Sequence, residues 1–291
     1  MISHVLAPVD FSQRCAASAP YAVALADRFK ARLTFTYVIP GLPYQGTDKE
    51  AFYGLRGEVV SGRELDQYYR TRLNQFVQEA TGKADVDKIL LKGDISQRLE
   101  EYSRENRVDL VVIPTHGYGP FRRMLLGSVA SRILHDLTCP IFSGAHVPEL
   151  PDLPPRFRRV ACALDLGPHS EMLLGWACKF AKVWEASLTL IHAAPKVEFP
   201  VNQKHFVKDD WHNKLVAAGR EVMEQLMERA ACEAQVSVQA GHPVHSVVAA
   251  AADERADVLI IGRGRASDIG SRLPTNAYGI IRGARCPVIS V

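Results

Sequence analysis

The fold is decided by the stretch VLAPVD at residues 5–10, which returns as VACALD at residues 160–165. Each copy is an apolar run that ends on an acid, and the two acids, Asp10 and Asp165, are 155 positions apart. A polar turn, an apolar helical pattern and a second strand-like run (33–38 and 188–193) follow at the same offset. Self-similarity at a fixed offset indicates two copies of one structural unit.

The later part of each half repeats as well. The apolar run VDLVVI at 108–113 matches ADVLII at 256–261, and each half ends in a Cys-Pro strand, at 139–142 and 286–289. Strands that alternate with helical patterns predict βαβ units around a parallel sheet. We therefore predict an α/β fold of two tandem Rossmann-like domains, each an open parallel five-stranded sheet flanked by helices.

The boundary between the halves is marked by prolines. The segment PELPDLPPR at 148–156 has the composition of a stiff, extended linker. We predict domain 1 at residues 1–147, the Pro-rich linker at 148–156 and domain 2 at 157–291. The second half then has room to rotate, and pairing of the two final strands would cover both open sheet edges. We expect an intrachain pseudo-dimer of this kind, and a homodimer of whole chains is left open.

Composition narrows the class of protein. The chain is 47% hydrophobic and 23% charged, with a formal net charge of +3, so it lacks the basic surplus of a nucleic-acid-binding protein. We find no signal-peptide pattern and no apolar run of the roughly 18–20 residues that would cross a membrane. Six scattered cysteines form no CxxC pair. These features predict a reduced, cytoplasmic protein.

In an open parallel sheet, ligands bind at the carboxyl ends of the strands. Two strands of the first half end there, and a glycine-containing loop follows a third strand before Gly127 and Ser128 open a helix. The unpaired N–H groups at such a helix start attract phosphate. The candidate site of the first half comprises Pro8, Asp10, Val38, His116, Gly117, Gly127 and Ser128.

This spacing resembles the universal stress protein family, whose nucleotide-binding members carry Gly-x2-Gly-x9-Gly-Ser/Thr. Gly117, the nine residues after it, Gly127 and Ser128 match, whereas Pro114 stands at the first glycine. The resemblance covers nearly the whole chain, one family domain per half. It implies a stress-response regulatory protein that binds an adenine nucleotide, usually ATP. In that reading Asp10 serves the nucleoside end, the Val38 backbone faces adenine, and the glycines with Ser128 hold phosphates.

The second half keeps less of the pattern. Its candidate residues are Asp165, Gly262, Gly264 and Thr275, but Pro274 replaces the helix-opening glycine and Ala163 replaces Pro8. Proline fits the first turn of a helix, yet it removes an N–H that phosphate would use. We therefore expect nucleotide binding mainly in domain 1.

Other readings stay open. The chain lacks the Gly-Lys-Ser/Thr of a phosphate-binding loop and shows no obvious general base near Ser128, which counts against the alternative of a slow ATPase or nucleotide-activating enzyme. A scaffold that binds an unknown protein partner and no nucleotide is the third reading. His242 and His245 have a spacing compatible with a metal site, which Cys232, His205 or His212 would join, but surface histidines are the expected interpretation.

Overall fold

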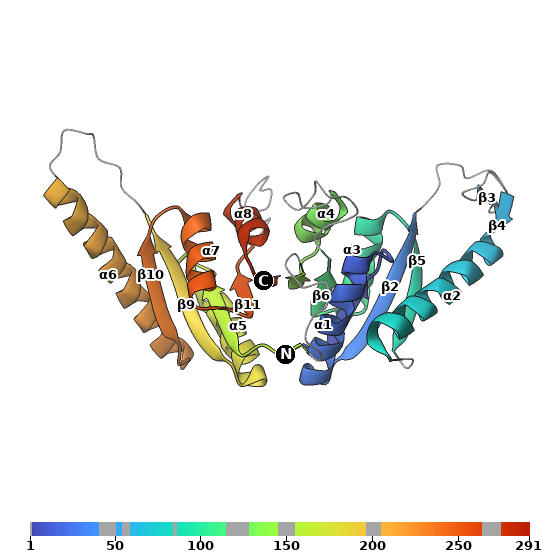
Figure 1. The fold of residues 1–291 in the computed structure, drawn as a ribbon, viewed down its shortest axis with the longest axis horizontal. Coiled ribbons are helices and arrows are strands. Elements are labelled where there is room, and N and C mark those ends of the chain that lie inside the picture. Colours follow the sequence, from blue (N-terminus) through green and yellow to red (C-terminus); the bar gives the residue numbers. More distant parts are fainter. Residues whose placement is uncertain are drawn as a thin grey trace. The chain divides into compact units, whose positions relative to one another are not determined.

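The computed structural model describes residues 2–40, 51–53, 59–83, 86–114, 128–144, 155–195, 205–263 and 275–291. The chain forms two compact units, built on residues 1–141 and on residues 156–291. Each unit is an α/β body (Figure 1). Among the described residues, no helix is both long enough and apolar enough to cross a bilayer.

The first unit follows the predicted alternation of strands and helices. Its elements are β1 (His4–Pro8), α1 (Gln13–Phe29), β2 (Arg32–Pro40), β3 (Ala51–Tyr53), β4 (Val59–Ser61), α2 (Gly62–Thr81), β5 (Asp87–Gly93), α3 (Ile95–Glu105), β6 (Leu110–Ile113), α4 (Ser128–Asp136) and β7 (Ile141–Ser143). The strand order is β5-β2-β1-β6-β7, and β5, β2, β1 and β6 pair in parallel. The short strands β3 and β4 form a separate antiparallel pair.

The second unit repeats this plan. Its elements are β8 (Arg159–Ala163), α5 (Ser170–Trp184), β9 (Ser187–Ala194), α6 (His205–Ala230), β10 (Gln235–Ala240), α7 (Pro243–Asp253), β11 (Val258–Ile261), α8 (Thr275–Gly283) and β12 (Val288–Ser290). The order β10-β9-β8-β11-β12 is all parallel. The prediction of two Rossmann-like units with parallel sheets is therefore confirmed.

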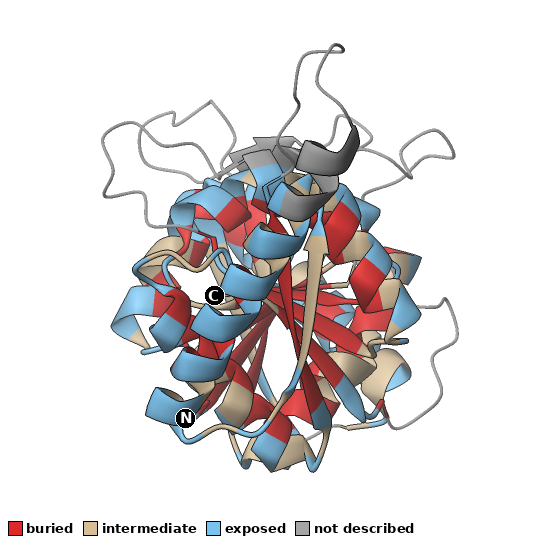
Figure 2. Ribbon diagram, turned by 90° about the vertical axis from the view of Figure 1, so that its left-hand side faces the viewer, coloured by how far each residue is buried: buried red, intermediate tan, exposed pale blue. Residues whose placement is uncertain are grey.

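The sheets form the core of each unit. All four residues of β6 and of β11 are buried, as expected of strands that are covered on both faces. In the first unit α1 packs with α2 and α3 with α4, and in the second unit α5 packs with α6 and α7 with α8. Figure 2 shows buried strands at the centre and exposed outer helix faces. Each sheet thus has helices on both faces, and its carboxyl edge carries the candidate residues.

The repeat extends to unusual backbone conformations. Phe11 and Leu166 both have φ of 61°, and the helix-ending residues Lys30 and Glu185 both have φ of 54°. Each pair is separated by the same 155 positions that relate the two acids. A left-handed conformation costs energy for a residue with a Cβ atom, so its recurrence shows that both copies need the same turns.

One cysteine pair corrects the expectation of a fully reduced chain. Cys178 and Cys232 form a disulfide, with their Cα atoms 6.2 Å apart at a sequence separation of 54. Cys15, Cys162 and Cys286 are buried thiols, and Cys139 is a partly buried thiol; none of the four is part of a disulfide. No local sequence pattern signals the bond, because Cys178 lies on α5 and Cys232 follows α6, and the two meet only in the folded unit.

Candidate functional site

The first candidate element is the turn after β1. Its end is fixed by the Val9 N–H, which donates to the Thr36 carbonyl of β2 at 2.8 Å. Asp10 is exposed, and its Oδ1 accepts from the Ser12 N–H at 2.9 Å. Ser12 is buried and caps α1 by accepting from the Cys15 N–H at 3.1 Å. The acid therefore stands on a turn that is held by β2 on one side and by α1 on the other.

A buried thiol lies beneath this carboxylate. Burial raises the pKa of Cys15, and the nearby negative charge of Asp10 raises it further. The Cys15 Sγ donates weakly to the Pro8 carbonyl at 3.8 Å. The Cys15 thiol next to Asp10 is thus neutral near neutral pH, and a neutral thiol is a poor nucleophile.

Val38 lies at the same edge on the neighbouring strand. Pro8 pairs with Thr36, so Val38 lies two residues beyond the last paired residue of β1. Backbone groups alternate sides along a strand, and the Thr36 carbonyl faces β1. The N–H and C=O of Val38 therefore face the space beyond the end of β1, where Asp10 stands. The structure brings Pro8, Asp10 and Val38 together at one edge.

An aromatic cluster, which the sequence analysis missed, borders the Asp10 turn. It consists of Phe11, Tyr37, Tyr69 and Phe76: the Phe11 ring centroid lies 4.6 Å from that of Tyr37 and 5.7 Å from that of Phe76, and Tyr37 stacks on Tyr69 at 4.7 Å. The Arg72 guanidinium carbon lies 4.3 Å from the centroid of Phe11. Burial, with Tyr69 as the next cause, raises the pKa of Tyr37, so its hydroxyl stays protonated.

A sequence signal for this cluster exists. Tyr69, Arg72 and Phe76 follow the i, i+3, i+7 spacing of one helix face, and Phe11 and Tyr37 each adjoin a predicted site residue. The helix in question is α2, which packs on β2 and β5 beside the turn. Helical spacing shows that the three side chains share a face, but only the fold shows that this face meets Phe11.

The structure describes only part of the predicted phosphate-binding segment of the first half. His116, Gly117 and Gly127 lie outside the described residues. α4 begins at Ser128, as the sequence predicts, but the side chain of Ser128 is not among those described. β6 ends at Ile113, directly before the half-buried Pro114. The phosphate-binding role of these residues stays a prediction.

The second unit has the equivalent acid in a different setting. The Oδ1 of Asp165 accepts from the Gly167 N–H at 2.9 Å and from the Ser170 hydroxyl at 3.1 Å. Ser170 is the first residue of α5. This carboxylate oxygen therefore has two donors from its own turn, whereas Asp10 in the first unit accepts from the Ser12 N–H and lies next to the weak thiol donor of Cys15.

The residue equivalent to Tyr37 is His192, 155 positions later, and it is buried. Its Nδ1 lies 2.8 Å from the Leu164 carbonyl, next to Asp165. A Cβ atom placed on Gly219 of α6 would lie 3.0 Å from the His192 ring, so α6 packs closely on this side chain. In the second unit His192 thus packs against Gly219 of α6, whereas in the first unit Tyr37 stacks on Tyr69 of α2.

The remaining residues of the weaker site are seen in part. Gly262 is exposed and directly follows β11. Gly264 lies outside the described residues. Thr275 begins α8, but its side chain is not described. The structure therefore places Asp165 and Gly262 at the ends of the neighbouring strands β8 and β11.

The alternative of a metal site finds little support. The rings of His242 and His245 lie 5.5 Å apart between centroids, on exposed positions of the first turn of α7. Cys232, a candidate third ligand, is bonded to Cys178. Across the described part of the chain, no group of three or more His, Cys, Asp or Glu side chains could hold a metal ion.

Comparison with known proteins identifies the family. The model of the universal stress protein family matches residues 1–142 and 156–291. Universal stress protein MJ0531 of Methanocaldococcus jannaschii is 27% identical over 137 residues, which is 47% of this chain and 78% of that protein. Universal stress protein Rv2624c of Mycobacterium tuberculosis is 22% identical over 221 residues, 75% of this chain and 74% of that protein.

Solved structures agree on the fold. A universal stress protein from Archaeoglobus fulgidus superposes with a TM-score of 0.66 at 21% identity, covering 99% of this chain and 95% of that one. A protein described as a putative universal stress protein from Pseudomonas aeruginosa gives a TM-score of 0.67 at 14% identity, covering 100% and 93%. The chain belongs to the universal stress protein family and carries one family domain in each half.

Proposed function

We propose that this chain is a nucleotide-responsive regulatory protein that binds an adenine nucleotide, ATP or a close relative, mainly in its first half. In this proposal, occupancy of the site changes how the chain binds a protein partner in the cytoplasm. The observation that carries the proposal is the geometry at the edge of β1 and β2. There the exposed Asp10 carboxylate lies at the same sheet edge as the backbone of the buried Val38, whose N–H and C=O face the space beyond the end of β1.

Each part of this edge suits one part of a nucleotide. A carboxylate accepts hydrogen bonds from ribose hydroxyls, and a backbone N–H and C=O that lack a strand partner match the donor and acceptor edge of adenine. The start of α4 at Ser128 offers unpaired N–H groups to phosphate. The three parts come from the end of β1, the end of β2 and the helix that follows β6. The strands β6, β1 and β2 are neighbours in the sheet.

The two turns favour the first half as the binding site. Asp165 already accepts from two donors of its own turn, and a ribose hydroxyl would compete with them. Asp10 accepts from one backbone N–H of its turn and lies next to the weak thiol donor of Cys15, and both acids are exposed. In the second half, moreover, the helix after β11 begins directly after Pro274, which lacks an N–H.

Analysis of ligands that leave the purified protein tests the proposal. The full chain is purified without added nucleotide, denatured, and the released small molecules are identified by mass spectrometry. We expect an adenine nucleotide in amounts comparable to the protein. If none is released and none binds on titration, the chain is a nucleotide-free scaffold.

A hydrolysis assay separates the enzyme alternative. We expect ATP turnover to be absent or far slower than enzymatic catalysis, because the sequence lacks the Gly-Lys-Ser/Thr of a phosphate-binding loop and shows no obvious general base near Ser128. Steady-state hydrolysis at roughly 1–1000 per second would instead identify an ATPase.

A further inference from the structure

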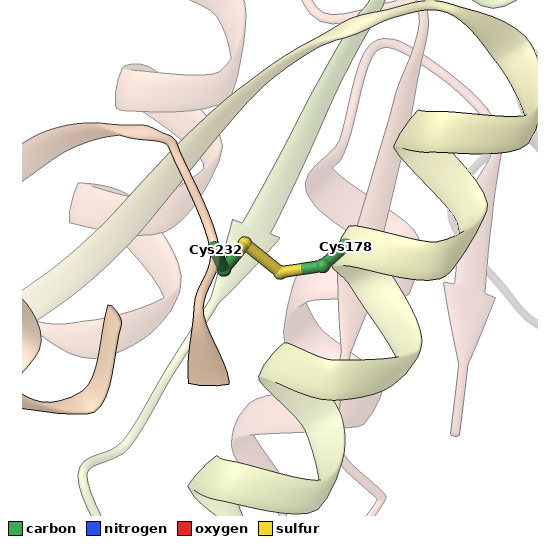
Figure 3. Close-up of a disulfide and its surroundings, with 2 residues drawn as sticks. All are labelled: Cys178 and Cys232. Carbon is green, nitrogen blue, oxygen red and sulfur yellow. A yellow bond between two sulfur atoms is a disulfide. The ribbon is translucent and has the colours of Figure 1, made fainter. Parts of the chain in front are cut away.

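We propose that the bond between Cys178 and Cys232 is a redox switch that locks α6 onto α5 in the second unit. Cys178 lies on α5, and Cys232 lies two residues after the end of α6 (Figure 3). Both residues are only partly buried, which leaves the bond open to attack by a small thiol. The inference concerns the second unit alone and does not depend on nucleotide binding.

Within the second unit, the disulfide is the cysteine site most open to a redox reagent. Cys15, Cys162 and Cys286 are buried, and burial raises the pKa of each thiol, to about 12 for Cys286. The thiolate is the reactive form of cysteine, so these three side chains react slowly near neutral pH. An oxidant or reductant that reaches the folded second unit therefore meets the disulfide before it meets its buried thiols.

The first unit shows that the fold does not require a bond at this place. α2 ends at Thr81 and is followed by Gly82 with φ of 66°, and then Lys83 reaches Asp27 of α1 at 2.7 Å. α6 ends in the same way, with Ala231 at φ of 45° followed by Cys232. Lys83 and Cys232 thus occupy equivalent positions after equivalent helices.

The two links differ greatly in strength. The side chains of Lys83 and Asp27 are 40% and 62% exposed, and an exposed ion pair of this kind contributes little to stability. A covalent bond that closes 54 residues restrains the chain far more. Since the first unit keeps its fold with the weak link, loss of the strong link in the second unit should loosen α6 without unfolding the unit.

A chain of contacts joins α6 to the Asp165 turn. Gly219, in the middle of α6, packs against the ring of His192. The Nδ1 of His192 lies within hydrogen-bond distance of the Leu164 carbonyl, and Asp165 follows directly. Restraint of α6 by the disulfide is therefore passed to the turn through packed groups.

The redox step balances with a thiol as the reductant. Two molecules of a monothiol supply two electrons and two protons, the bond between the Cys178 and Cys232 sulfurs breaks, and both become thiols. The two monothiol molecules leave joined as one disulfide. The reverse reaction, with a small disulfide as oxidant, forms the bond between Cys178 and Cys232 again.

The test uses the full chain in glutathione redox buffers of graded ratio. Free thiols are trapped by alkylation and counted by mass spectrometry, and hydrogen exchange is measured in parallel. We expect a reversible two-electron transition while the protein stays folded. On reduction, α6 peptides should exchange at least about tenfold faster, because the cross-link no longer limits local opening. Peptides of the Asp165 turn should also exchange faster on reduction, and the exchange rate of α2 peptides should not change.

The double variant C178S/C232S is the matched control. It should exchange like the reduced wild-type chain at every glutathione ratio, because it has no bond to form. The proposal is overturned if no bond forms in oxidised glutathione or if α6 exchanges equally in both states. It is also overturned if the bond resists reduction until the unit unfolds, since the disulfide would then be a permanent structural cross-link.

Discussion

The residue that follows each acid distinguishes the two turns at the smallest scale. Phe11 and Leu166 share a left-handed backbone, but only Phe11 brings an aromatic ring, which contacts Tyr37, Phe76 and Arg72. The same backbone strain is therefore compensated by ring packing in the first unit. The aromatic cluster is a structural support for the Asp10 turn.

We predict that Phe11→Ala destabilises the first unit by about 2 kcal/mol. The estimate lies below the cost of truncating a fully buried phenylalanine, because Phe11 is only partly buried. Leu166→Ala is the matched control: alanine meets the same backbone strain there but loses no ring contact. Hydrogen exchange of the β1 and β8 peptides compares the destabilisation by Phe11→Ala with that by Leu166→Ala. Equal destabilisation would show that the cluster does not support the turn.

Buried thiols predict the alkaline behaviour of the second unit. Cys162 is fully buried, and burial raises the pKa of its thiol above the ordinary value of 9.0. Above pH 9 the unfolded chain loses this proton while the folded chain keeps it. Each such thiol therefore lowers the free energy of unfolding by about 1.4 kcal/mol per pH unit in that range, and has no effect below it.

Between pH 9 and 10.5, the free energy of unfolding of the Cys162→Ala variant should fall less steeply than that of the wild-type chain, by about 1.4 kcal/mol per pH unit. All three tryptophans, Trp176, Trp184 and Trp211, lie in the second half, so tryptophan fluorescence during urea unfolding reports that half. Between pH 6 and 8 the variant and the wild-type chain should depend on pH alike. An unchanged slope above pH 9 would mean that the thiol is already ionised in the folded protein.

At the scale of the element, helix starts differ between the units. Ser12 caps α1 with a side-chain hydrogen bond, whereas His169 at the start of α5 makes none. We predict that Ser12→Ala costs about 1 kcal/mol, because a buried N–H loses its acceptor. His169→Ala should cost little. Urea unfolding combined with exchange of α1 and α5 peptides checks both, and equal costs would count against the capping role of Ser12.

Elements with a repeated pattern could be predicted from the sequence. The runs that became β1 and β2 recur 155 positions later as β8 and β9, and the run that became β6 recurs 148 positions later as β11. The carboxyl ends of β1 and β2 place Asp10 and Val38 at one edge. The start of α4 at Ser128 was also correct. Parallel strands all end at the same edge of a sheet, so this shared edge could be predicted from the sequence, whereas the strand order β6-β1-β2 comes from the structure.

Features that depend on side-chain contacts between distant elements could not be predicted. The Cys178–Cys232 bond joins α5 to the segment that follows α6, at a sequence separation of 54, and the Phe11 cluster joins a turn to a face of α2. The short antiparallel pair of β3 and β4 could not be predicted either, since three-residue strands carry too little pattern to detect. Spacing shows which residues share a face, but packing decides what that face meets.

At the scale of the whole molecule, packing of the halves through their final strands stays a prediction. It rests on the apolar final strand of each half, whose open edge would otherwise invite aggregation. Deleting the last strand would not test it cleanly, because Val288 and Ile289 are buried and pair with β11 in the core of their own unit.

Cutting the linker gives a cleaner test. A protease site placed within residues 148–156 separates the halves without touching either sheet. We expect the cut chain to elute as one species near the intact mass of 32.2 kDa, because paired edges hold the halves together. Elution of two separate halves would contradict the packing, and an uncut chain of twice the mass would indicate a homodimer.

The central claim, that the first half binds the nucleotide, is tested most directly by calorimetric titration of ATP into three full-length chains. The wild-type chain should show a single strong site, and Asp10→Ala should weaken it by roughly 10–150-fold, the loss of one charge-assisted hydrogen bond. Asp165→Ala, the matched substitution in the second half, should leave binding unchanged. Two equal sites in the wild-type chain, or equal losses in both variants, would contradict the account.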